Sequence, residues 1–457
     1  MKQQEIQHLY CRAGFGIKPE ELYAMSGKSR QFIVNSLFQR SAETYDLIID
    51  TSDLEGYTEQ NVIRDKRKRI GFIKDSKEKL KDFNVLWFDR MVNSNQILRE
   101  KMTLFWANHF VCRDVNVFHV QQYHNVLRQH ALGDFGDFVK AVSKEAAMLK
   151  YLNNKQNRKQ KPNENFAREL MELFTLGEGN YSEEDIQESA RAFTGYSHNF
   201  QGDFLLRKRQ HDYGFKTFFG HTGRYDGDDI IDFILEQKQC ARFICRKIYS
   251  YFVNDKIDEN KVEELTSVFY QDYDIENVMR HVFMSDWFYN DQNIGSKIKS
   301  PIEFLVGITR TVPIAFHNTK DILRFQKLLG QVLLNPPNVA GWKGGKSWID
   351  SNTIMLRLKL PSILLANAEI SIKEKGEFED SFENYYSKKR KKRLDYVSVN
   401  WDAFEKQYAN TTFEELKQQI IIPKLSEGTK RYLKTLNQNS KRDFCVQLMS
   451  LPEYQMC

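Results

Sequence analysis

Apolar residues recur every three or four positions along most of the chain, the spacing of helices with one buried face. The pattern is strongest between residues 79 and 118, where it predicts two buried helices. Its members there are Phe83, Leu86, Trp87, Met91, Leu98, Met102, Phe105, Trp106, His109 and Phe110. The same spacing predicts further helices in residues 5–40, 119–161, 229–236, 238–252, 258–270, 274–284, from Pro301 onward, 319–333 and 350–368. We therefore expect a mainly α protein with a large, bundle-like body of many helices.

Two segments interrupt the helical pattern. Alternating residues around 204–209 and 216–219 predict a short β-hairpin or an ordered loop near 200–222. Residues 334–349 are rich in Gly, Pro and Trp, and are expected to form an ordered lid or wall against the central helices. The whole chain has only nine Pro and 23 Gly in 457 residues, which favours helices over a many-turned β-architecture.

Charge and composition suggest a division of the chain into three parts. Residues 1–368 are predicted to form the main helical body, and residues 411–457 a C-terminal helical segment that packs back on it. Between them, residues 369–410 are charged and read as a linker or an exposed helix. They include six consecutive basic residues at 388–393, a run more typical of a solvated segment than of a nucleic-acid site. The net charge of +6 is mild, so a nucleic-acid partner is not expected.

Residues 162–196 are the stretch around which the chain is organised. Asn163 can cap a first helix that runs to about residue 176, and Gly177 provides a left-handed stop. Ser182 and Asp185 have the spacing of a capping box for a second helix, which Gly195 ends. The expected unit is two short helices joined by a glycine turn.

The first of these helices carries a stripe of charge. Glu164, Arg168 and Glu172 fall at i, i+4 and i+8, and Glu169 lies beside them. One interpretation is a solvated face with ion pairs. The other is a cluster facing a pocket, in which Glu169 is catalytic, Arg168 and the preceding Asn163 bind an anion, and Glu164 and Glu172 bind a divalent metal.

Polar residues outside this helix are further candidates for catalysis or for binding an anionic substrate. His109 lies in an apolar run, either as a satisfied core histidine or as a catalytic group. His211 and Asp212 are adjacent and could share a proton or a metal, or could form a surface turn. Candidate contacts to an anionic substrate are Arg12, Lys216 and Trp342, and Arg12 has the alternative role of anchoring the N-terminus.

Several classes of site and location are disfavoured by the sequence. The six cysteines contain no Cys-x-x-Cys pair and read as buried thiols. The glycines at 341–347 lack the spacing of a phosphate loop, so no nucleotide site is expected. No signal peptide and no run of about 18 apolar residues is present, so a cytoplasmic protein without a membrane span is expected, with export beside a partner or a trimmed leader as the alternative.

Specific motifs cover most of the chain and resemble a bacterial family catalogued as domain of unknown function 1800. They are His8-x-x-x-Arg12-x-x-Phe15-Gly16, Arg99-Glu100-Lys101-Met102, Trp106-x-Asn108-His109-Phe110, the stretch from Pro162 to Gly177, His211-Asp212-x-Gly214-x-Lys216, Asp226-Gly227 and the segment from Asn335 to Trp348. The resemblance implies no assigned reaction. Such proteins often accompany members of an uncharacterised family numbered 1501, which is similar to the alkaline phosphatase and sulfatase superfamily.

Two functional hypotheses follow. In the first, the helical body holds a polar pocket that binds an anion or a metal, and the protein is a hydrolase of an anionic substrate, with a divalent metal as its candidate cofactor. In the second, implied by the resemblance, the protein is a non-catalytic partner, scaffold or maturation factor for a sulfatase- or phosphatase-like protein of the family numbered 1501.

Overall fold

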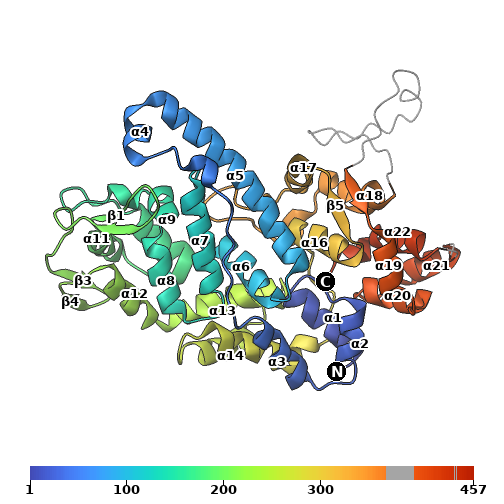
Figure 1. Ribbon diagram of the computed structural model, residues 1–457. Helices are drawn as coiled ribbons and strands as arrows, with labels where there is room; N and C mark the ends of the chain where they lie inside the picture. The colour runs from blue at the N-terminus through green and yellow to red at the C-terminus, as the bar shows by residue number, and fades with distance from the viewer. Residues whose placement is uncertain (367–395, 437, 439) are drawn as a thin grey trace.

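The computed structural model describes residues 1–366, 396–436, 438 and 440–457 (Figure 1). Its first helices are α1 (Gln3–Arg12), α2 (Pro19–Met25), α3 (Arg30–Arg40), α4 (Glu59–Arg64), α5 (Lys66–Asn93), α6 (Ile97–His109), α7 (Val117–Gln129), α8 (Phe135–Lys144), α9 (Ala146–Tyr151), α10 (Asn165–Glu169) and α11 (Glu183–Ala192). The later ones are α12 (Gly227–Leu235), α13 (Lys238–Phe252), α14 (Glu259–Phe269), α15 (Ile275–Met284), α16 (Pro301–Thr311), α17 (Thr319–Leu329), α18 (Ser351–Leu365), α19 (Trp401–Gln407), α20 (Phe413–Ile420), α21 (Glu427–Thr435) and α22 (Lys441–Met449). The prediction of a mainly α protein is confirmed.

The only strands among the described residues form three antiparallel pairs. They are β1 (Tyr196–His198) with β2 (Phe204–Leu206), β3 (Lys216–Phe218) with β4 (His221–Gly223), and β5 (Ile314–Phe316) with β6 (Val397–Val399). The segment predicted as one hairpin or ordered loop thus contains two small hairpins, which lie beside α11 and α12 in Figure 1. Gly195 begins the first with φ +81°, and a Cβ there would meet the Arg207 carbonyl oxygen at 2.9 Å, so only glycine fits.

Two hydrophobic cores are arranged along the molecule. The first joins α1, α3 and α6 to the helices from α7 to α15, and the second joins α5 to α16, α17, α18 and the C-terminal helices. Helix α6 contributes to both, because Phe105 and Trp106 pack in the first core and Leu104 packs in the second. Nearly every residue of this helix is buried, as expected for one that lies between two cores.

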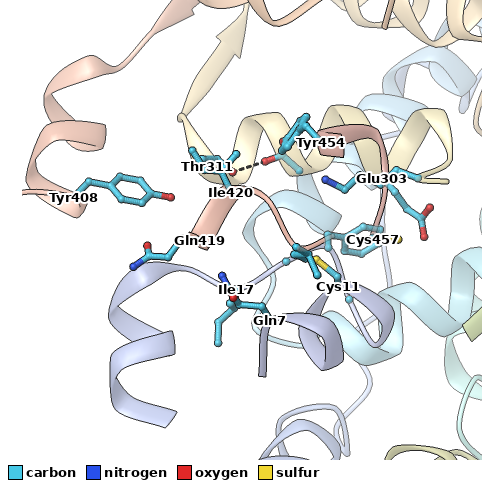
Figure 2. A pocket seen from close by; sticks show the side chains of 16 residues that line it. Gln7, Cys11, Ile17, Glu303, Thr311, Tyr408, Gln419, Ile420, Tyr454 and Cys457 are labelled. Carbon is cyan, nitrogen blue, oxygen red and sulfur yellow. Dashed lines mark hydrogen bonds between the residues drawn. The ribbon is translucent and has the colours of Figure 1, made fainter. Parts of the chain in front are cut away.

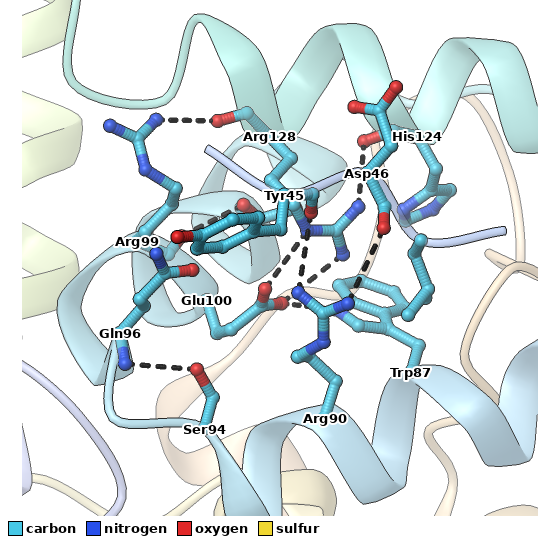
Figure 3. A network of polar contacts seen from close by, with 12 residues as sticks. Tyr45, Asp46, Trp87, Arg90, Ser94, Gln96, Arg99, Glu100, His124 and Arg128 are labelled. Carbon is cyan, nitrogen blue, oxygen red and sulfur yellow. Dashed lines mark hydrogen bonds and ion pairs between the residues drawn. The ribbon is translucent and has the colours of Figure 1, made fainter. Parts of the chain in front are cut away.

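Buried charges on α6 fix its neighbours in place. Arg128 of α7 donates to the carboxylate of Glu100 over 2.9 and 3.2 Å, and Trp87 of α5 donates to the same carboxylate over 3.1 Å (Figure 3). Both charged side chains are fully buried. Three consecutive helices are therefore held together by one carboxylate that water does not reach.

The chain ends meet on one side of the molecule, where the N-terminal helix packs against the C-terminal helices (Figure 1). Gln4 donates to the carbonyl oxygen of Ile422 over 3.1 Å, and Gln7 donates to that of Gln418 over 2.9 Å. The basic run at 388–393 lies outside the described residues. No helix within the described part of the chain is both long and apolar enough to span a bilayer.

Candidate anion-binding cleft

The two helices predicted in residues 162–196 are present, but the first of them departs from regular α-helical geometry. The regular α-helix α10 ends at Glu169 and continues as a π-helix, η3 (Leu170–Thr175). The amide of Leu176 therefore donates to the carbonyl of Met171, five residues back, over 2.8 Å. The second helix begins as predicted, with a capping box between Ser182 and Asp185. π-Turns of this kind leave carbonyl groups that need partners from elsewhere.

His109 and Lys247 provide those partners. His109 Nε2 lies 2.9 Å from the carbonyl oxygen of Phe174, and Lys247 Nζ donates to the carbonyl of Leu173 over 2.8 Å and to His109 Nδ1 over 3.2 Å. Burial, and then the charge of Lys247, hold the pKa of His109 well below its usual value, so the imidazole is neutral. Burial also lowers the pKa of Lys247 to about 8.

The charged stripe of α10 pairs within itself and with α11. Arg168 bonds to both carboxylate oxygens of Glu183 over 2.9 Å and to Glu164 over 3.2 Å. Glu172 accepts a bond from Tyr181 over 3.1 Å. The pKa of Glu169 is raised, by burial first and by Glu172 next.

The capping prediction for Asn163 is close to the observed turn. Its side chain accepts a bond from the amide of Asn165 over 3.1 Å, although the residue that immediately precedes α10 is Glu164. The amide of Asn163 in turn donates to the side chain of Asn157 over 2.9 Å. These bonds order the entry to the central helix.

His211, Asp212 and Lys216 lie together after the first hairpin. His211 Nδ1 lies 2.7 Å from the carbonyl oxygen of Thr194, and Asp212 accepts a bond from Arg191 Nε over 2.8 Å. Burial alone would raise the pKa of Asp212, but the bond from Arg191 outweighs it and lowers that pKa. Lys216 Nζ donates to the backbone carbonyls of Asp212 and Gly214 over 2.6 and 3.1 Å. The group fastens the hairpin segment to α11.

Arg12 and Trp342 lie in other surroundings. Arg12 is buried and donates to the carbonyl of Asn293 over 2.9 Å and to Ser296 over 3.1 Å, while its Nε and Nη1 have no partner among the described residues. Trp342 is held through its backbone by the side chain of Asn108, over 2.7 and 3.1 Å. The segment predicted as a wall thus contacts α6.

The predicted site residues are therefore distributed among several local groups, and the contacts above do not join these groups. No cluster of three or more His, Cys, Asp or Glu side chains within the described ranges has the arrangement of a metal site. The function of these residues stays a prediction.

A cleft of about 640 Å³ lies near the same motifs, between α5, the end of α9, the segment after α6 and residues 332–335. We call it the basic cleft. Its four cationic side chains are Lys77, Lys81, Arg113 and Lys150, and its apolar lining comes from Leu80, Val115, Tyr151, Leu323, Val332, Leu333 and Leu334. Such a volume suits a small organic molecule.

Arg113 and Lys77 are the cations of the basic cleft with the most capacity to bind a ligand. Among the described residues Arg113 makes one side-chain bond, from Nη1 to Asn335 over 3.2 Å, which leaves most of its donors without a partner there. Lys77 has no hydrogen bond or ion pair with any described residue. Lys81 forms an exposed pair with Glu78 over 2.6 Å, a contact that water screens.

Asp114 is the one carboxylate that lines the basic cleft, and it is already neutralised. Its oxygens accept bonds from Lys150 over 2.5 and 2.6 Å, from His119 Nδ1 over 2.7 Å and from the amide of Val115 over 2.6 Å. Burial would raise the pKa of Asp114, but the bonds from His119 and Lys150 outweigh it and lower that pKa. The cleft consequently carries a net positive charge.

These residues were not identified from the sequence. Arg113 and Asp114 lie three and four residues after Phe110, the end of the Trp106–Phe110 motif, and a charged pair at the end of a buried apolar run was a usable signal. Lys77 and Lys81 are one turn apart on α5 but sit among many other charges. Their convergence with Lys150 depends on tertiary packing.

Fold and cleft together define a mainly α protein with a basic, partly apolar cleft. The family model described as "Protein of unknown function (DUF1800)" matches residues 8–456, nearly the whole chain. The chain belongs to this family, and the resemblance seen in the motifs is confirmed. No curated protein and no solved structure matches the chain.

Proposed function

We propose that the protein binds an organic anion in the basic cleft. The observation that carries the proposal is the imbalance of charge, with four cations around one carboxylate that is already paired with Lys150 and His119. Positive charge gathered in a cleft attracts anions and raises their local concentration.

The lining indicates the class of anion. An arginine with free donors favours planar or tetrahedral oxyanions such as carboxylates and phosphate esters, which it can bind through two bonds. The leucines and valines of the cleft favour an apolar group on the same molecule, because its burial is favourable by about 25 cal/mol per Å². A small carboxylate or phosphate monoester with an aromatic or aliphatic part meets both requirements.

The test uses 1-naphthyl phosphate as the probe and calorimetric titration as the measurement. We expect saturable binding that weakens as salt is raised, and no binding of neutral 1-naphthol. Arg113→Met and Lys77→Met should each weaken binding several-fold, whereas Lys424→Met, which removes an exposed lysine outside the cleft, should not. Equal affinity in the Arg113→Met, Lys77→Met double variant and the wild type would refute the proposal.

A hydrolase acting on an anionic substrate is a second proposal, supported by the raised pKa of Glu169, since general acids need a carboxyl that holds its proton. The same probe reports hydrolysis through the fluorescence of released naphthol, measured with and without Mg²⁺ or Zn²⁺. Turnover that is lost in Glu169→Gln and His211→Ala would support the predicted catalytic residues. Turnover unchanged in both variants would count against them. A metal requirement that is lost in Glu164→Gln and Glu172→Gln would support the predicted role of Glu164 and Glu172 in holding metal.

The non-catalytic alternative is supported by the contacts of the same residues, because His109, Arg168, His211 and Lys216 each bond to backbone carbonyls or carboxylates within the chain. Such satisfied networks specify a fold without chemistry. Affinity purification of the tagged protein from its own cells should then recover a sulfatase- or phosphatase-like protein. Its absence from repeated purifications would remove this alternative.

A further inference from the structure

A second, much smaller cavity lies where the N- and C-terminal parts of the chain meet (Figure 2). Its volume is about 60 Å³, and α1, α16, α20 and the last residues of the chain surround it. Cys11, Lys299, Glu303, Tyr408, Tyr454 and Cys457 are among the residues that line it. We call it the terminal cavity. None of the residues that line the basic cleft lines it.

A short backbone pairing builds one side of the terminal cavity. The amide of Cys457 donates to the carbonyl of Lys297 over 2.8 Å, the amide of Lys297 donates back over 3.2 Å, and the amide of Lys299 donates to Gln455 over 2.8 Å. These bonds fix Cys457 and Lys299 next to each other in space. Ser300 then caps α16, so the positive end of that helix dipole lies directly after Lys299.

Lys299 has no ionic partner in this cavity. Its side chain is buried, with the residue only 8% exposed, and its Nζ makes no hydrogen bond or ion pair with any described residue. The group lies 3.8 Å from the centre of the Tyr454 ring, a cation–π contact. A buried ammonium group without a counter-charge is costly, because its loss of hydration is not compensated.

The neighbouring charges do not provide the missing partner. Glu303 is occupied by Lys101 and by the amide of Ser300 at 2.6 Å. The buried Arg357 adds another positive charge, and its Nη1 lacks a partner among the described residues. Burial raises the pKa of Cys11 to about 11, so its thiol remains neutral and does not act as the counter-ion. Cations are therefore in excess around the cavity.

We propose that the terminal cavity binds a small inorganic oxyanion, of the size of phosphate or sulfate, against Lys299. The positive helix end and the hydroxyl group of Tyr408 add to the preference for an anion with several oxygen atoms, whereas the hydroxyl group of Tyr454 is bonded to Thr311 (Figure 2). A water molecule needs roughly 10–15 Å³ of such space, so the cavity has room for a few waters or one such ion but not for an aromatic ester. This site is separate from the basic cleft and does not depend on the function proposed for it.

The experiment measures how fast iodoacetamide modifies each cysteine of the full-length protein, followed by peptide mass spectrometry. Potassium phosphate is compared with potassium chloride at equal ionic strength. An ion bound at Lys299 shields the thiols of Cys11 and Cys457, so phosphate at about ten times its Kd should slow both reactions about tenfold. Cys112, which is partly exposed like Cys11 and does not line the cavity, should react at the same rate in both salts.

Two substitutions test the assignment to Lys299. Lys299→Met should abolish the shielding and weaken phosphate binding about tenfold or more, and Lys299→Arg, which keeps the charge, should retain both. Arg113→Met in the basic cleft should leave the shielding unchanged, so the two proposals can fail independently. The inference is wrong if phosphate does not slow the reaction of Cys11 in the wild type, if Cys112 slows equally, or if shielding persists in Lys299→Met. Should Lys299→Met not fold, Lys299→Gln replaces it and the wild-type comparison with Cys112 still decides.

Discussion

His109 Nε2 lies 2.9 Å from the carbonyl oxygen of Phe174, at the end of the π-helix in the most distinctive motif of the chain. The bond joins two motifs that are 65 residues apart in sequence. Lys247, from a third segment, completes the contact through the other ring nitrogen. These contacts assign His109 a role in holding the irregular helix end, where carbonyl groups would otherwise be buried without donors.

Replacing this imidazole should therefore cost stability. We expect His109→Ala to lower the free energy of unfolding by about 2–3 kcal/mol, because it leaves a buried carbonyl unpaired and opens a void. His221→Ala is the matched control, since that ring is 42% exposed, stacks on Phe233 and pairs with the exposed Glu236. The control should change stability by less than about 0.5 kcal/mol in urea unfolding. Similar values for the two variants would contradict the structural role of His109.

The turn at Gly341 provides a second prediction. Its φ is +74°, and a Cβ there would lie 2.4 Å from Oδ1 of Asn108, the atom that accepts the amide of Trp342. Gly344 has nearly the same φ, +73°, but nothing within 4 Å of an added Cβ. Gly344 combines φ +73° with ψ −174°, a region nearly restricted to glycine, so Gly344→Ala should cost about 1–3 kcal/mol from backbone strain alone.

Gly341→Ala should cost more than Gly344→Ala, because it must also displace Asn108 from the turn. Both glycines have positive φ, so the difference in unfolding free energy between the two variants, measured in urea, reports mainly the cost of displacing Asn108. Tryptophan fluorescence of the folded proteins should change in Gly341→Ala, where Trp342 loses its anchor, and stay constant in Gly344→Ala. Equal costs would show that Asn108 can move aside freely.

Sequence periodicity was sufficient for most of the fold. The ranges predicted at 238–252 and 274–284 match α13 and α15 closely, because both have a clear apolar face and defined ends. The π-helix was missed, since residues 170–175 have an ordinary helical composition and the extra residue per turn is stabilised by His109 and Lys247 from elsewhere. Local patterns cannot report a geometry that distant partners impose.

The candidate sites were harder to predict than the fold. Residue type identified Arg12, His211 and Asp212 as unusual, but spacing could not show that Asp212 would pair with Arg191. The basic cleft and the terminal cavity depend on which helices meet. Tertiary packing alone brings Lys77 into the same cleft as Lys150, and Lys299 into the same cavity as Cys457. Burial without a partner, as for Lys299, is likewise invisible in a sequence.

Glu145 links stability to pH. It is 8% exposed, its Oε2 has no partner among the described residues, and burial raises its pKa from 4.5 to about 8. Between these two values the folded state holds a proton that the unfolded state has released, so stability falls as pH rises.

Glu145→Gln removes this ionisation. From pH 4.5 to about 8 the free energy of unfolding of the wild type should therefore fall by about 1.4 kcal/mol per pH unit relative to that of the variant. Above about pH 8 the difference between the two proteins should stay constant. Urea unfolding at several pH values measures this slope, and Glu178→Gln at an exposed position should run parallel to the wild type. A Glu145→Gln curve parallel to the wild type would show that the buried carboxyl is ionised or solvated in the folded protein.

The buried pair between Glu100 and Arg128 yields the last prediction. Each side chain is fully buried, and removing one leaves the other as an uncompensated charge. Glu100→Met and Arg128→Met should each lower the free energy of unfolding by about 3–5 kcal/mol. The double variant should cost much less than the sum of the two, because it removes both charges and replaces them with apolar groups.

Arg168 and Glu183 form the matched surface pair, with side chains 37% and 70% exposed. Their single substitutions to Met should cost less than about 1 kcal/mol and show little coupling, since water screens the charges. We expect a strong coupling energy between Glu100 and Arg128 and a weak one between Arg168 and Glu183. This result would indicate that the Arg99–Met102 motif acts in the assembly of α5, α6 and α7. If the buried pair instead behaved additively, Glu100 and Arg128 would each be stabilised mainly by their other bonds, to Trp87 and to Asn125.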